Sequence, residues 1–439
     1  MREKIEMDFF MSFKTYIEYN MSTICKNFRQ FLNYVERGCL PKIKQLIKSK
    51  QVDPSAEDNE AFILAAGLGI LKVVKYLSKL PGVDASARHN EAIIRAARNR
   101  HLKVVKYLSK LPGVKPSAQN NNAIIWASEN GYLKIVQFLS KLPGVDASDQ
   151  DSLAILLAVR RGHLAIVQLL STLPGVDASA QDNEAIINAA SNGHLAVVEY
   201  LSKLPGVDAS AQNNNAIIEA ARTGHLEVVE YLSTLPGVVA SAQNNYAIIE
   251  AASNGQLKVI QYLLTLTGVD ASVRNNIAIR CAAWNGHLKT VQFLLTLPGV
   301  DVSANKNDAI IQAAGRGHLE VVQLLLTLDE VDVTAENNDT IFWADYFNHL
   351  SIVAMLLYHE PKVAASLSSS KHKKYDKLLL SKLRTVVHKI SVSMAEFPMP
   401  LIIEMIEQSI DFAIYIPYHI KWNMVKAIKH SKLCRLNQD

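Results

Sequence analysis

The sequence is poor in cysteine, with only four among 439 residues (Cys25, Cys39, Cys281 and Cys434). They lie far apart and form no C-x-x-C pair, so we expect neither a disulfide framework nor a zinc cluster. Aromatic residues are also scarce, at 7% of the chain. Because 49% of the residues are hydrophobic, the chain still has enough apolar material to form a core, and a disordered protein is not expected.

Long uninterrupted apolar runs are missing as well. The most apolar late stretch, residues 401–420, contains Glu404, Glu407 and Asp411, which argues against a transmembrane segment. The first residues mix acidic with apolar side chains and lack the apolar region of a secretory signal. We therefore predict a protein of a reducing compartment, the cytoplasm.

The net charge of +5 is small for a chain of this length. Residues 1–50 carry ten Lys/Arg against five Asp/Glu, residues 361–439 carry thirteen against six, and the segment between them is therefore net acidic. This balance implies no global field for a nucleic acid or a membrane, and we expect no nucleic-acid partner.

Sequence motifs of the common enzyme classes are absent. The chain contains no G-x-x-x-x-G-K-[ST], G-x-G-x-x-G, G-x-S-x-G or H-E-x-x-H, so nucleotide binding, a serine hydrolase and a zinc protease have no support. Seven histidines recur at intervals of 31 residues or multiples of it. A zinc site needs ligands that converge on one point, so we interpret these histidines as structural. We predict a protein that is not an enzyme and needs no cofactor or metal.

What the sequence does contain is a repeat. The block Ala-Ile-Ile-x-Ala-Ala recurs, with small variations, every 31 residues from Ala61 to Thr340, and we call its first residue the anchor. A glycine follows eight positions after the anchor, except at Arg100 and Asn348. A weaker copy around Gly38 brings the number of copies to eleven. Such a short period predicts a solenoid of stacked units.

Each unit is expected to be a pair of helices. An Asn stands two residues before the anchor in nine of ten copies, which predicts an N-cap for a short first helix. The glycine would end that helix in the left-handed conformation. The second helix has apolar residues at helical spacing, and Pro-Gly stops it in seven copies. A short extended stretch such as Val-Asp-Ala-Ser-Ala would lead to the next cap.

The residues from Ala220 to Leu232, AARTGHLEVVEYL, resemble the ankyrin repeat, and the GVDASA that recurs after the second helix resembles that family's GADVNA. The resemblance covers residues 28–360 and implies an all-α ankyrin-repeat solenoid of about eleven 31-residue helix-turn-helix units. The family's Thr-Pro-Leu-His start is replaced by x-Ala-Ile-Ile, and the loop before it is about three residues shorter, which predicts blunted hairpin fingers. This short-fingered style is similar to ankyrin proteins of intracellular bacteria, giant viruses and social amoebae.

We predict four segments: an N-terminal helical segment (1–27), the array (28–360), a linker (361–371) and a basic helical C-terminal module (372–439). The last copy is unusually aromatic, at 342–347, and either water or the tail would cover it. Three helices are expected in the tail, at 375–395, 400–416 and 418–433. The basic residues between Lys371 and Lys389 favour a solvated helix face, with contact to acidic lipids as the alternative.

The resemblance implies a scaffold, expected to be monomeric, that binds a partner protein through the concave face of the array. Positions just before the anchor and three, six and seven residues after it vary between copies, whereas the core positions do not. In the middle copies these variable positions hold the aromatic and charged types that often dominate binding energy. The candidate partner-binding residues are Trp126, Glu129, Arg160, Arg161, Glu219, Arg222, Tyr246, Glu250, Trp284 and Arg316. The alternative function is that of a secreted effector of an intracellular bacterium or virus, acting in the host cytosol, whose C-terminal module supplies an activity or a targeting signal.

Overall fold

A computed structural model describes residues 26–360, and within that range the chain forms helices and turns but no strand. Residues 26–36 are helical. The following helices are α2 (Leu40–Lys48), α3 (Ala56–Gly67), α4 (Leu71–Leu77), α5 (Ala87–Arg98), α6 (Leu102–Leu108), α7 (Ala118–Glu129), α8 (Leu133–Leu139), α9 (Asp149–Arg160), α10 (Leu164–Leu170), α11 (Ala180–Ser191), α12 (Leu195–Leu201), α13 (Ala211–Thr223), α14 (Leu226–Ser233), α15 (Ala242–Ser253), α16 (Leu257–Leu263), α17 (Val273–Trp284), α18 (Leu288–Leu294), α19 (Ala304–Arg316), α20 (Leu319–Leu325), α21 (Ala335–Tyr346) and α22 (Leu350–His359). Most of the predicted N-terminal segment, the linker and the C-terminal module lie outside the described residues.

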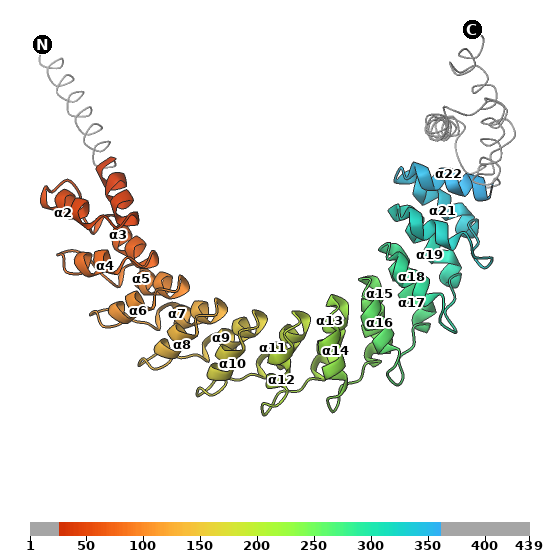
Figure 1. The fold of residues 1–439 in the computed structure, drawn as a ribbon, viewed down its shortest axis with the longest axis horizontal. Helices are drawn as coiled ribbons and strands as arrows, with labels where there is room; N and C mark the ends of the chain where they lie inside the picture. Colours follow the sequence, from red (N-terminus) through yellow and green to blue (C-terminus); the bar gives the residue numbers. More distant parts are fainter. Residues whose placement is uncertain (1–25, 361–439) are drawn as a thin grey trace, which may run out of the picture. The chain divides into compact units, whose positions relative to one another are not determined.

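The predicted helix pairs are confirmed (Figure 1). Each copy has a longer first helix with an odd number, from α3 to α21, and a shorter second helix with the next even number. The array divides into two compact units: residues up to Ala220 together with Glu227–Val239, and Ala221–Leu226 together with the residues from Ala240. Within each unit, first helices pack on first helices and second helices on second helices, as α5, α7 and α9 do.

Small and branched apolar side chains form the core. In α11, Ala185, Ala189 and Ala190 are fully buried, and their size lets neighbouring first helices approach closely. The second helices contribute two branched residues and a leucine, such as Val198 and Leu201 of α12, which are also fully buried. Leu201 therefore belongs to the shared core.

The segment before each first helix differs from the prediction. Instead of an extended stretch ending in an Asn cap, each first helix is assigned from a residue three positions before the Asn. Its next three residues are left-handed: in α11 these are Gln181, Asp182 and Asn183, with φ of 54°, 54° and 67°. Left-handed conformations cost non-glycine residues about 1–2 kcal/mol each, and least for Asn and Asp. The extended-stretch prediction is wrong at the end of the stretch: before α11, residues 178–179 form a turn with Ser179 at φ −93° and ψ 0°, and the left-handed residues follow it.

The Asn side chain makes a bond between repeats rather than an N-cap. In the first unit, the Oδ1 atom of Asn59 accepts the backbone N–H of Asp84 at 2.9 Å, which lies 25 residues later. Ser152, the one exception to Asn, does the same with its Oγ atom and the N–H of Asp177 at 3.0 Å. We call this bond the latch. The latch acceptors are Asn59, Asn90, Asn121, Ser152, Asn183 and Asn214 in the first unit, and Asn245, Asn276 and Asn307 in the second. The N-cap prediction is therefore wrong.

Short turns order the segment that each latch holds. Asp177, whose N–H enters the latch of Ser152, accepts both the backbone N–H and the hydroxyl of Ser179 at 2.8 and 2.6 Å. The same pair of bonds at Asp146 lowers the pKa of that carboxyl, with the hydroxyl of Ser148 as the larger cause. These side-chain bonds replace the secondary structure that the sequence alone predicted.

The glycine after each first helix has two reasons to be there. Gly286 has a φ of +76°, which confirms the predicted left-handed helix end. A Cβ atom on Gly286 would also lie 2.4 Å from Nδ1 of His318 in the next repeat. Where Arg100 takes the glycine position in the left-handed conformation, the next repeat has Tyr132 instead of His.

Candidate functional site

The repeating histidines bind neighbouring backbone, as a structural role requires. The Nε2 atom of His163 lies 3.0 Å from the carbonyl oxygen of Glu129, at the end of the first helix one repeat earlier. His194, His287, His318 and His349 make the equivalent contact at 2.9–3.1 Å, and Gln256 makes a longer one at 3.4 Å. Carbonyls at a helix end lack partners within the helix, so the histidine of one repeat caps the helix of its neighbour.

Variable side chains line one surface of the first helices, which we call the first-helix face. It consists of the residue before each anchor and those three, six and seven after it, and it carries all ten candidate residues. In the first unit, α7 carries Trp126 and Glu129, α9 ends at Arg160 beside Arg161, and α13 carries Glu219. In the second unit, Arg222 lies near the end of α13, α15 carries Tyr246 and Glu250, α17 ends at Trp284, and α19 ends at Arg316. No candidate residue is fully buried.

Several candidate residues contact each other across neighbouring repeats. In the first unit, Arg161 forms an ion pair with Glu129 at 3.1 Å. The guanidinium of Arg98 lies 4.5 Å from the ring centroid of Trp126. Glu219 accepts a hydrogen bond from Ser191 at 3.4 Å. Residues at these positions therefore have partners one repeat away, 28 or 32 positions along the chain.

The second unit repeats this arrangement with other residues. Arg316 stacks on Trp284 at 4.3 Å, and both side chains remain exposed. The guanidinium of Arg274 lies 5.9 Å from the ring of Tyr246. The phenol of Tyr246 also donates a hydrogen bond to Glu250, and this bond raises the tyrosine pKa above its usual value. The arginines already restrict the rotation of these aromatic rings in the free protein. Contact with a partner would therefore cost the rings little further conformational entropy.

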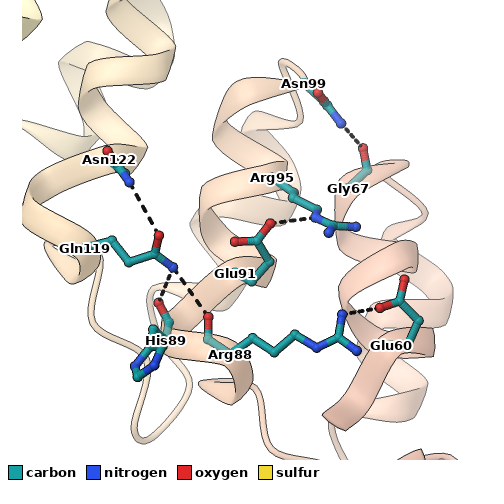
Figure 2. Close-up of polar contacts among 9 residues, drawn as sticks. All are labelled: Glu60, Gly67, Arg88, His89, Glu91, Arg95, Asn99, Gln119 and Asn122. Carbon is teal, nitrogen blue, oxygen red and sulfur yellow. Dashed lines mark hydrogen bonds and ion pairs between the residues drawn. The ribbon is translucent and has the colours of Figure 1, made fainter. Parts of the chain in front are cut away.

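A hollow of about 560 Å³ opens on the first-helix face between α5 and α7. Its lining residues are Glu91, Ile94, Arg95, Arg98, Asn99, Gln119, Asn122 and Trp126. Figure 2 shows the polar contacts around it, where Arg95 pairs with Glu91 at 2.7 Å and Asn99 donates to the carbonyl of Gly67 at 2.7 Å. Most of this hollow was missed among the candidates, although Glu91, Arg95, Arg98 and Asn99 occupy the same variable positions.

The left-handed turns at the start of the first helices contact the turns of neighbouring repeats. Gln119, the first left-handed residue of α7, donates to the carbonyl of His89 at 3.2 Å, one repeat earlier (Figure 2). Gln150 and Gln212 reach the preceding turn in the same way, at 3.0 and 3.1 Å. Arg88 instead forms an ion pair with Glu60. These contacts between turns hold a backbone conformation that would otherwise be strained.

Two features of the described residues concern metal binding and thiol reactivity. Within residues 26–360, no group of three or more His, Cys, Asp or Glu side chains lies close enough to hold a metal ion. Burial raises the pKa of the Cys281 thiol on the first-helix face, which disfavours the reactive thiolate. The arrangement can offer aromatic rings, guanidinium groups and amides to a ligand surface.

The second helices at the start of the first unit form a surface that carries positive charge only, unlike the first-helix face. In the first unit the second helices α2, α4, α6 and α8, with the residues directly after them, carry exposed lysines and no Asp or Glu, and we call this the lysine face. Its members are Lys42, Lys44, Lys48, Lys72, Lys75, Lys79, Lys103, Lys106, Lys110, Lys134 and Lys141. Three of them lie over a ring of the next repeat, as Lys75 does over Tyr107 at 5.7 Å.

Comparison with known families bears on the whole array. A family model described as "Ankyrin repeats (3 copies)" matches residues 31–120, 62–151, 155–239, 235–306 and 279–366. Among curated proteins, a search found no significant match. No helix between residues 26 and 360 is long and apolar enough to span a membrane.

Proposed function

Because the chain belongs to the ankyrin-repeat family, whose repeats are generally protein–protein interaction modules, we propose that it is a non-enzymatic scaffold whose first-helix face binds a partner protein. The family's fold alone does not choose the face. The observation that supports this one is the exposed Trp284 stacked under Arg316, since Trp and Arg are the types most enriched among residues that dominate binding energy.

The geometry of the face favours a protein over a small ligand. Its aromatic and charged side chains are spread over successive first helices rather than gathered in one enclosed cavity, and the hollow beside Trp126 is lined mostly by polar side chains. Pockets for small molecules are instead mainly apolar and enclose most of the ligand. We propose that the scaffold acts as a monomer in the cytoplasm.

The test starts with the full-length protein and a partner captured by proximity labelling. We expect Trp284→Ala combined with Arg316→Ala to weaken capture by about 30-fold or more, the effect of losing a dominant residue. The control is Lys258→Ala with Lys289→Ala, which changes exposed residues on the second helices of the same unit. Equal capture by all three proteins, with unchanged unfolding curves, would exclude the first-helix face of this unit.

The lysine face favours a second candidate, binding of an acidic partner protein. Lysines without intervening acids create a local positive field, which raises the association rate with an acidic surface. If this face binds the partner, Lys72→Glu with Lys103→Glu would abolish capture that the Trp284 and Arg316 variant retains. Capture through the lysine face would also weaken strongly as the salt concentration rises, because salt screens exposed charges.

The alternative of an effector whose C-terminal module supplies an activity or an address stays a proposal, as do the division into four segments and contact of the basic module with acidic lipids. The residues concerned lie largely outside the described range. The sequence supports a distinct module because no glycine follows Gly317 and the 31-residue period ends. Partners captured by the full-length chain but not by residues 1–360 would identify a role for the module.

A further inference from the structure

The last repeat exposes an aromatic surface on α21, which we call the α21 aromatic face. Its members are Phe342, Trp343, Tyr346 and Phe347, which are 51%, 37%, 67% and 53% exposed. The rings contact each other: Trp343 lies 5.2 Å from Phe342, 5.8 Å from Tyr346 and 6.0 Å from Phe347, centroid to centroid. Contiguous exposed apolar groups of this kind mark an interaction surface.

The repeat register shows that part of this surface is a stacking surface. Phe342 stands two residues after the anchor, at a position that the preceding repeats bury, except in the copy that carries the half-buried Arg280 there. The equivalent residues Ile94, Ile125, Leu156 and Ile187 in the first unit, and Ile249 and Ile311 in the second, are between 3% and 7% exposed. Phe342 is exposed because no repeat follows α21 and α22 within the described residues. The end of a solenoid usually carries polar residues at such positions.

The stretch of chain that contains this face carries charge of one sign. Residues 317–360 contain eight Asp and Glu and no Lys or Arg. Ten residues later in the chain, residues 371–389 contain seven Lys and Arg and a single acid, Asp376. An acidic last repeat is therefore followed in the chain by its electrostatic complement.

The following segment also has the apolar pattern that the face requires. Leu379, Leu383, Val386 and Ile390 are spaced as i, i+4, i+7 and i+11, which predicts one apolar stripe on a helix over 375–395. Residues 360–374 separate it from α22, and 15 residues span up to about 50 Å when extended. Because α21 and α22 pack together, this tether is long enough to reach the face.

We propose that residues 375–395 dock on the α21 aromatic face of the same chain and serve as the cap of the array. The apolar stripe covers Phe342 and its neighbours, and the lysines on the flanks of the segment face the carboxylates of the last repeat. The C-terminal module is thus a distinct module that is held at one end of the array. Trp343, Tyr346 and Phe347 occupy first-helix-face positions, so the docked segment covers that face in the last repeat, and the proposal does not rest on partner binding by the other repeats.

The test is hydrogen–deuterium exchange on the full-length protein. We expect amides of 375–395 to exchange about tenfold or more slowly than in the variant Phe342→Asp with Tyr346→Asp, a change that corresponds to about 1.4 kcal/mol of opening free energy. The matched control is Leu68→Asp with Val239→Asp, two exposed apolar residues elsewhere in the array. Reciprocally, Leu383→Asp should accelerate exchange in α21, and high salt should weaken the protection.

Three results would overturn the proposal. Immediate exchange of 375–395 in the unaltered protein would show that the segment does not dock. Equal effects of the α21 variant and its control would place the segment elsewhere. Protection that rises with protein concentration, together with the mass of a dimer, would assign the face to a second copy of the chain.

Discussion

The latch offers the sharpest test of how the repeats are joined. In the second unit, Oδ1 of Asn245 accepts the N–H of Asp270 at 2.9 Å, and the asparagine is buried and left-handed at φ +63°. Asn245→Ala removes the acceptor and leaves the Asp270 N–H without it, at a cost of about 1–3 kcal/mol. Alanine also tolerates the left-handed conformation less well than asparagine, by about 1 kcal/mol. We expect the free energy of unfolding to fall by about 2–4 kcal/mol.

The chain itself suggests the control. Ser152 occupies the equivalent position at φ +63° and holds its latch at 3.0 Å, so Asn245→Ser keeps an acceptor where the backbone already accepts serine in another copy. Urea unfolding of the full-length protein measures the loss, and hydrogen exchange of the peptide containing Asp270 localises it. The serine variant should lose less than half as much as the alanine variant.

Two outcomes would refute this reasoning. If the free energies of unfolding of the alanine and serine variants agreed within about 0.5 kcal/mol, the range of neutral surface changes, the latch would not contribute to stability. Unchanged exchange at Asp270 in the alanine variant would show that the repeats are held together by apolar packing alone.

Further predictions concern the core, the helix ends and the face. Leu201→Ala should cost about 2–5 kcal/mol in urea unfolding, the range for a buried leucine, and a loss under about 0.5 kcal/mol would contradict its burial. Gly286→Ala should destabilise through both the positive φ and the contact with His318, and His318→Ala in the same chain should recover only the contact part. The neutral phenol of Tyr246 is stabilised by Glu250 in the folded state, because its pKa is raised above 10.0. That contribution is complete below pH 10 and is lost as pH rises through the raised pKa; an ultraviolet titration against Tyr246→Phe should show the tyrosine pKa fall in Glu250→Gln.

The sequence predicted what depends on periodicity. The 31-residue register, the helix pair and the left-handed glycine follow from residues that recur at fixed intervals, and these predictions are confirmed. The structural reading of the histidines also agrees with their contacts, because His163 and its equivalents bond to backbone carbonyls one repeat earlier.

What the sequence could not predict depends on partners in the next repeat. An asparagine before a helix suits both an N-cap and a left-handed residue, and only the N–H 25 residues later decides between them. The candidate residues of the first-helix face were likewise predicted from variability at single positions. Its contacts between repeats join residues 28 or 32 apart, as in Arg98 with Trp126 and Arg161 with Glu129. A search for complementary types at these two offsets could have found the pairs.

The fixed reach of the bonds between repeats has a consequence for how such a gene can change. The latch spans 25 residues and the histidine contact 34, and both recur with every 31-residue period. If recombination removed residues 123–153, Asn122 would be followed by Ala154, and the latch of Asn121 would meet Asp177 where it had met Asp146. A deletion whose length is not a multiple of 31 residues would misalign every bond that crosses it. The array can therefore be lengthened or shortened in whole periods, which changes the area of the first-helix face without altering the chemistry of its core.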